Sequence, residues 1–268
     1  MLNLKGINNE QATSLIPEST ILLGYRGSVA HGTYVPEYGG SIRDDKDLLG
    51  VAIGPLQSYF GLARFDQHIK EAEAEDGVIW DVVVYELRKY IKLMLKANPN
   101  VLSLLFLPEH LYALRHPLGQ RLIDKRDIFC SREAYHSFVG YAHGQLHRMT
   151  HPSGKHMGKK RRELVVKFGF DCKNAGHLIR ILRVGIEFLT TGEIRVQRED
   201  AQELIEIKKG EWSLERVERL ADELFALAHE ALIHSPLPIK PDYAKADALC
   251  QDILCEWFGA QVRSEERR

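Results

Sequence analysis

Short apolar runs, separated by glycine and acidic residues, dominate the first half of the chain. Residues 21–23 are apolar and bounded by glycine, a pattern typical of a short buried strand. A second apolar run starts at residue 48, and a third, residues 82–84, follows Asp81. The charged residues 67–75 predict a solvated strand or loop that leads into the third run through a turn at Asp76 and Gly77.

Helical periodicity takes over toward the second half. Residues 86–97 place apolar side chains on one face and predict an amphipathic helix that ends before Pro99. Beyond residue 131 the pattern predicts helices over residues 132–149, 163–189, 199–209, 213–234 and 242–258. We therefore expect an α+β fold with α/β-like character. A small mixed-sheet domain, residues 1–128, precedes a helical domain, residues 129–268, that closes a cleft over the sheet.

Composition narrows the class of protein. The chain has 268 residues, of which 44% are apolar and 27% charged, and its net charge is −1, which fits an ordinary soluble protein. Contact with nucleic acid would then need a local basic patch. The four cysteines form no Cys-x-x-Cys pair, which argues against a zinc ribbon and a disulfide framework. With no apolar run near the roughly 20 residues of a membrane helix, we expect a cytoplasmic protein without a membrane partner.

Two short motifs follow the first strand. Gly27 permits a sharp turn, and Ser28 offers a hydroxyl and free N–H groups that suit a phosphate. Asp45 and Asp47 are two residues apart, so on a strand their side chains point to the same face. Lys46 is expected to point to the opposite face, together with Asp44. Such a pair of aspartates is either a Mg²⁺ site or a polar strand end. A Gly-Ser dipeptide alone is weak evidence for a phosphate site, because it occurs in many loops.

Asp81 stands at the start of a later strand. It either completes a three-carboxylate site for two metal ions or is an exposed residue at a strand start. In the helical half, Lys173, His177 and Arg180 are spaced by four and three residues and share one helix face. From the residues alone, this face is either the polar side of an amphipathic helix or a grip for a triphosphate.

The order of these motifs resembles the DNA polymerase β-type nucleotidyltransferase superfamily, and in particular a branch of predicted nucleotidyltransferases associated with RNA repair. The turn Gly-Ser-x-x-x-Gly-x is present at residues 27–33, and Asp-x-Asp-x-x-Gly-Val at residues 45–51. The resemblance spans roughly residues 20–210 and includes residues 85–90, 98–102, 173–180 and 191–193. The long loop of residues 34–43, and Lys46 in place of an apolar residue, depart from the superfamily pattern.

The resemblance implies a metal-dependent transfer of a nucleoside monophosphate from an NTP, ATP among them, to an acceptor hydroxyl, with release of pyrophosphate. It implies an RNA end as the acceptor and two Mg²⁺ ions, or Mn²⁺ in their place, as cofactors. Asp45, Asp47 and Asp81 would be the catalytic, metal-holding residues, with Asp81 helping to deprotonate the hydroxyl. The residues implied to bind the nucleotide are Gly27, Ser28, Lys173, His177 and Arg180.

Other features stay open. His143, His147 and His151 recur every four residues, and residues 155–162 contain five Lys or Arg side chains, which either form a solvated linker or bind phosphates. The acceptor is alternatively a protein side chain or a small molecule. A non-catalytic nucleotide-binding or antitoxin-like partner is a different class, against which the three aspartates argue. The preferred NTP and the oligomeric state do not follow from the sequence.

Overall fold

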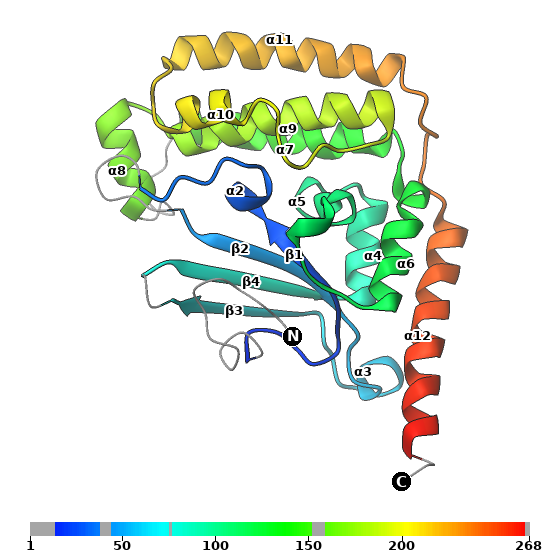
Figure 1. Ribbon diagram of the computed structural model, residues 1–268. Coiled ribbons are helices and arrows are strands. Elements are labelled where there is room, and N and C mark those ends of the chain that lie inside the picture. Colours follow the sequence, from blue (N-terminus) through cyan, green and yellow to red (C-terminus); the bar gives the residue numbers. More distant parts are fainter. Residues whose placement is uncertain (1–13, 38–43, 75–76, 152–158, 266–268) are drawn as a thin grey trace.

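The computed structural model describes residues 14–37, 44–74, 77–151 and 159–265. Its centre is a five-stranded mixed sheet in the order β3-β4-β2-β1-β5 (Figure 1). Strands β2 and β4 pair in parallel, and the other neighbours pair antiparallel. The strands are β1 Thr20–Arg26, β2 Lys46–Ala52, β3 Gln67–Glu73, β4 Ile79–Glu86 and β5 Tyr112–Arg115. With the helices around it, this sheet confirms the predicted α+β fold.

The sheet separates two groups of buried side chains, because neighbouring residues of a strand point to opposite faces. Leu49 and Val83 belong to the large core shared with the helices, whereas Leu48 and Trp80 belong to a smaller core on the other face. Lys46 lies over the Trp80 ring, with its Nζ 5.1 Å from the ring centroid. Lys46 therefore points away from the helix-covered face, as the alternation predicts.

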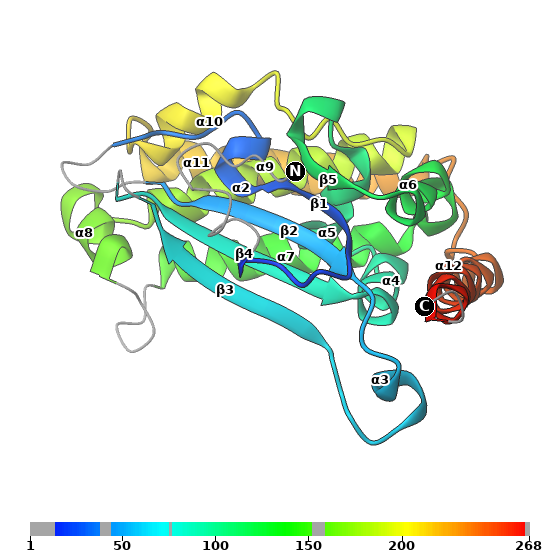
Figure 2. The same ribbon diagram turned by 60° about the horizontal axis from the view of Figure 1, so that its bottom comes forward.

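Among the described residues, five α-helices follow strands in the first half of the chain, and one of them shows how the sequence sets their position. Helix α4 buries the apolar face predicted for it and contacts strands β2 and β4. The Glu86 carboxylate begins it by accepting a hydrogen bond from the Lys89 N–H. The short loop with α3 projects beyond the sheet in Figure 2. The helices are α2 Gly27–Ala30, α3 Gln57–Phe60, α4 Leu87–Leu95, α5 Pro99–Leu102 and α6 Pro117–Asp124.

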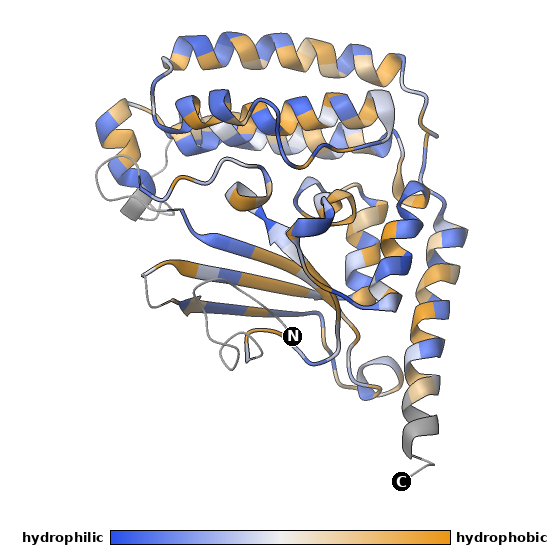
Figure 3. Cartoon of the chain, viewed as in Figure 1, coloured by the Kyte–Doolittle hydropathy of each residue, from blue (hydrophilic) through white to orange (hydrophobic). Residues whose placement is uncertain are grey.

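A layer of helices covers one face of the sheet, above it in Figure 1. Helix α9 is central to this layer and contacts α7, α8, α10 and α11. Figure 3 shows that strand β2 is hydrophilic where it begins, beneath this layer, and mainly hydrophobic beyond. The helices are α7 Glu133–Thr150, α8 Lys159–Phe168, α9 Cys172–Thr191, α10 Ala201–Lys208 and α11 Leu214–Ile233.

The last helix, α12 Tyr243–Glu265, returns to the first part of the chain. It runs beside α4 and α6 in Figures 1 and 2, and Arg121 of α6 donates a hydrogen bond of 2.7 Å to Glu256. A segment from the predicted helical domain thus packs on the predicted sheet domain. The division at residue 128 remains a proposal.

The pattern fails at two places. The prediction of one continuous helix over residues 163–189 is wrong, because Gly169 adopts a left-handed conformation with φ of 83° and ends α8. Asp171 then begins α9 by accepting a hydrogen bond of 3.0 Å from the Asn174 N–H. Strand β5 and helix α6 are not predicted either, since both are too short to show a clear period. Asp76 of the predicted hairpin turn lies outside the described residues.

Among the helices that the structure describes, none combines the length and the apolar character that crossing a lipid bilayer requires.

A close helix–strand contact gives a test of the fold. A β-carbon on Gly119 of α6 would clash with the Ile21 carbonyl oxygen of β1, so we expect Gly119→Ala to lower the free energy of unfolding by about 2 kcal/mol or more. Gly140 in α7 has no atom within 4 Å of such a carbon, and Gly140→Ala should raise the free energy of unfolding by about 0.5–1 kcal/mol. Urea denaturation measures both, and equal effects would contradict the packing.

Candidate active site

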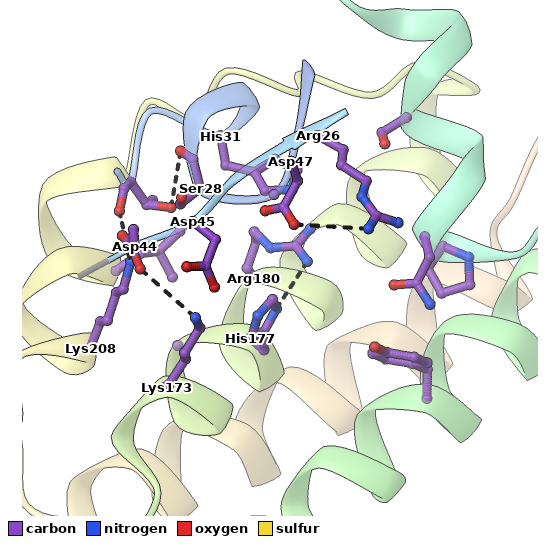
Figure 4. A pocket seen from close by; sticks show the side chains of 18 of the residues that line it. Arg26, Ser28, His31, Asp44, Asp45, Asp47, Lys173, His177, Arg180 and Lys208 are labelled. Carbon is purple, nitrogen blue, oxygen red and sulfur yellow. Dashed lines mark hydrogen bonds and ion pairs between the residues drawn. The ribbon is translucent and has the colours of Figure 1, made fainter. Parts of the chain in front are cut away.

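A pocket of about 410 Å³ lies between the start of β2 and the helical layer (Figure 4). The sheet side contributes Arg26, Gly27, Ser28, Asp44, Asp45 and Asp47. The helical layer contributes Tyr141 from α7, Lys173, His177 and Arg180 from α9, and Lys208 from α10. Seven of the eight site residues predicted from the sequence therefore line one cavity, and Asp81 is not among its lining residues.

Glycine is required at the turn after β1. Gly27 has a φ of 62°, and a β-carbon at this position would clash with the Asp47 carboxylate. The chain enters helix α2 here, and the Thr33 N–H donates a hydrogen bond of 2.8 Å to the Ser28 carbonyl oxygen. Gly27 thus lets the turn come close to the Asp47 carboxylate, with Ser28 beside it in the pocket wall.

Three charged residues form a row across three neighbouring strands. Arg26 pairs with Asp47 across β1 and β2, and Asp47 pairs with Asp81 across β2 and β4. The Arg26 Nη2 atom lies 3.0 Å from Asp81 Oδ2 and 3.8 Å from Asp47 Oδ1. The structure therefore places Asp81 beside Asp47, as expected, but with a guanidinium between their carboxylates that the sequence pattern does not predict.

Burial sets the protonation of Asp47. It raises the pKa of this carboxyl to about 6, an effect that the nearby Asp81 charge strengthens and the Arg26 charge opposes. A carboxylate whose charged form is penalised in this way is one that a bound cation stabilises. A positive charge beside Asp47, from the Arg26 guanidinium or from a metal ion, therefore stabilises its charged form.

Asp44 belongs to the pocket, and the expectation that it faces away with Lys46 is wrong. Asp44 precedes β2, so strand alternation does not govern its direction, and it is 1% exposed. The carboxylate accepts hydrogen bonds from the Val35 N–H and from Lys208, and its Oδ1 atom lies 3.8 Å from Lys173 Nζ. Asp44 thus holds two lysines of the helical layer at the pocket.

Lys208 is a pocket residue that the sequence analysis missed. Its Nζ also donates a hydrogen bond of 3.1 Å to the Thr33 carbonyl oxygen. Burial lowers the pKa of this lysine, while the Asp44 charge acts in the opposite direction. Its position could have been noticed in the sequence, because Lys208 follows Leu204 by four residues and so lies on the apolar face of the predicted helix.

Two side chains of α9 form the floor of the pocket. Arg180 Nη2 donates a hydrogen bond of 3.3 Å to His177 Nδ1, which leaves the proton of the neutral imidazole on Nε2. Burial holds the pKa of His177 well below its usual value and lowers the pKa of Arg180 to about 10. At neutral pH, His177 is therefore an uncharged donor and Arg180 remains a cation.

The segment after α9 ties the helical layer to the Gly-Ser turn. His31, a buried pocket residue not predicted from the sequence, has its Nδ1 atom 3.0 Å from the Val196 carbonyl oxygen. The Arg198 N–H donates a hydrogen bond of 3.2 Å to the His31 carbonyl oxygen, and the Arg198 side chain pairs with Glu187 and Asp200. These contacts fix the turn against the layer that carries the basic side chains.

The donors only partly match a metal site. In the described part of the chain, no three His, Cys, Asp or Glu side chains form a group that could hold a metal ion. Asp45 and Asp47 nevertheless line one wall with hard oxygen donors, which suit Mg²⁺, and the raised pKa of Asp47 indicates a carboxylate that a cation stabilises. Asp45 and Asp47 therefore fit a divalent cation, whereas Asp81 is paired with Arg26.

The three histidines of the helical half, His143, His147 and His151, are not among the residues that line this pocket. His143 stacks on Phe225, and the rings of His147 and His151 stack on each other with centroids 4.9 Å apart. Residues 155–158, the first half of the predicted basic run, lie outside the described residues. Arg161 in α8 donates a hydrogen bond of 3.2 Å to Asn174, next to Lys173.

The family comparison identifies the class of protein. The sequence profile of the RNA repair pathway DNA polymerase beta family, RlaP, matches residues 2–252. The chain belongs to this family. It is therefore a nucleotidyltransferase, as the resemblance of its motifs implies.

Similarity to individual proteins is low. A nucleotidyltransferase-like protein from Exiguobacterium sibiricum is 15% identical, with 84% of this chain and 75% of that chain covered and a TM-score of 0.32. The CD-NTase CdnG of Bradyrhizobium diazoefficiens, solved in complex with GTP, is 11% identical, with 83% and 82% covered and a TM-score of 0.23. None of the curated proteins matches the chain.

The buried pair of Asp44 and Lys208 predicts a coupled loss of stability. Asp44→Asn leaves a buried ammonium without its carboxylate, so we expect the free energy of unfolding to fall by about 3 kcal/mol in urea denaturation. In the double variant Asp44→Asn/Lys208→Met the loss should be smaller than the sum of the single losses. Glu109→Gln, which breaks an exposed pair with Arg115, should cost less than about 1 kcal/mol. Additive losses would contradict the pairing.

Proposed function

We propose that the chain transfers a nucleoside monophosphate from an NTP, bound as its divalent-metal complex, to the hydroxyl of an RNA end, and releases pyrophosphate. The observation that carries the proposal is a pocket that combines carboxylates, a Gly-Ser turn and basic side chains from a second layer. Family membership supports the reaction class. The choice of an RNA end as the acceptor rests on the description of the family as an RNA repair pathway family.

The pocket suggests how the nucleotide lies. Ser28 and the backbone of the Gly27 turn offer hydrogen-bond donors on one wall. Lys173 and Lys208 offer positive charge on the facing wall, where Asp44 holds them in place. A triphosphate between these walls meets donors on both sides and is held in one orientation for attack at its α-phosphate.

Asp45 and Asp47 would hold the metal ion, Mg²⁺ or Mn²⁺ in its place. When bound, such an ion neutralises charge on the triphosphate and favours ionisation of the attacking hydroxyl. The chain contributes the two carboxylates on one wall and the close approach of Gly27 to Asp47. Metal binding also offsets the cost of a charged Asp47 in its buried position.

The remaining residues position charge rather than form bonds. Arg180 keeps its positive charge at neutral pH, and His177 presents a neutral Nε2–H donor. We assign both to the negative charge of the phosphates. Asp81 is the direct neighbour of Asp47 on strand β4. It is the candidate to accept the proton of the acceptor hydroxyl once its ion pair with Arg26 is broken.

Label transfer tests this function. The protein is incubated with Mg²⁺, each α-labelled NTP in turn, and either cellular RNA or a whole-cell extract. We expect label in the RNA fraction, because the α-phosphate moves to the acceptor. Asp45→Asn/Asp47→Asn should abolish the transfer, and Asp222→Asn, at an exposed position of α11, should leave it unchanged.

The distribution of label separates the alternatives. Label in protein or in small molecules, lost in the Asp45→Asn/Asp47→Asn variant, would replace RNA as the acceptor and keep the reaction. Absence of label in every fraction, despite measurable NTP binding, would contradict the proposed transfer.

A further inference from the structure

The Arg26 side chain lies against Asp47 and Asp81, two of the carboxylates that the family resemblance would assign to metal ions. The sheet register sets this position, since Arg26, Asp47 and Asp81 are direct neighbours on β1, β2 and β4. The guanidinium contacts both carboxylates, at 3.8 Å from Asp47 and 3.0 Å from Asp81. Figure 4 shows the Arg26 and Asp47 side chains turned toward each other.

The contact is a built feature of the fold. Arg26 is the last residue of β1 and lies directly before the left-handed Gly27, with extended φ and ψ angles of −131° and −176°. Its side chain is 23% exposed and that of Asp47 is 27% exposed, so water screens their attraction only partly. The strand ladder and the turn hold the arginine opposite the two acids.

We propose that Arg26 is a resident counter-ion that competes with a divalent cation for Asp47 and Asp81. In the nucleotide-free protein the guanidinium donates a hydrogen bond to Asp81, lies beside Asp47, and keeps the affinity for a metal ion low there. A metal–nucleotide complex that enters the pocket displaces the guanidinium from both carboxylates. This inference rests on the proposed function of the same pocket, and it makes Arg26 a positioning residue that favours entry of the metal together with the nucleotide.

Competition of this kind has a simple thermodynamic consequence. A positive charge that must leave before a cation enters weakens the binding of that cation, and removing the charge strengthens it. An arginine that served only to bind phosphates would act differently. Its removal would weaken nucleotide binding and leave the affinity for the bare metal ion unchanged.

The test measures binding of Mn²⁺ alone to the nucleotide-free chain, by the electron paramagnetic resonance signal of the free ion. We expect two uncharged variants, Arg26→Gln and Arg26→Met, to lower the apparent Kd for Mn²⁺ by about fivefold or more. Coupling between competing ligands typically reaches that range. Arg115→Gln serves as the matched control, since Arg115, the last residue of β5, lies outside the pocket and pairs with Glu109. Its Kd should equal that of the unaltered chain.

A second substitution assigns the gain to Asp81. Asp81→Asn should have less effect on Mn²⁺ affinity in the unaltered chain than in the Arg26→Gln variant, where it should remove the gain. Thermal unfolding confirms that each variant folds. Unchanged Mn²⁺ affinity in both folded Arg26 variants, or a gain that persists without Asp81, would overturn the inference. The assay uses neither nucleotide nor acceptor, so absence of label transfer would reject the reaction and leave this result standing.

Discussion

Like charges that are brought together where water screens them only partly repel each other, and this cost governs the candidate active site. Four aspartates, Asp44, Asp45, Asp47 and Asp81, stand at the start of two parallel strands, and burial alone already raises the pKa of Asp47. The fold offsets part of the repulsion with its own cations. Arg26 lies against Asp47 and Asp81, whereas Lys173 and Lys208 lie against Asp44.

The position of the helical layer follows from the same balance. Its lysines reach the acids only because the layer is fixed to the sheet, through the buried pair of Lys208 with Asp44 and through the contacts of residues 196–198 with His31. A metal–nucleotide complex brings both positive and negative charge into this pocket, so the same residues that stabilise the fold are available to bind it. Stability and proposed function therefore depend on one set of charges.

The sequence predicts the local parts of this arrangement well. Strand alternation gives the strands that hold Asp47 and Asp81, and the Gly-Ser turn and the helix face of Lys173, His177 and Arg180 follow from short motifs. Contacts between distant residues do not follow. Arg26 meets Asp81 because of strand register, and Asp44 meets Lys208 because an irregular segment turns its carboxylate inward. The helix break at Gly169 escaped prediction because the apolar period continues through it.

The central claim is that one pocket binds the triphosphate between the Gly-Ser turn and the helical layer. A crystal structure with Mn²⁺ and an NTP analogue whose α,β-bridging oxygen is replaced by a methylene group tests it most directly. The account predicts the triphosphate between Ser28 and the two lysines, Lys173 and Lys208, with anomalous signal from manganese at Asp45 and Asp47. A nucleotide bound elsewhere, or phosphates that touch neither wall of this pocket, would contradict it.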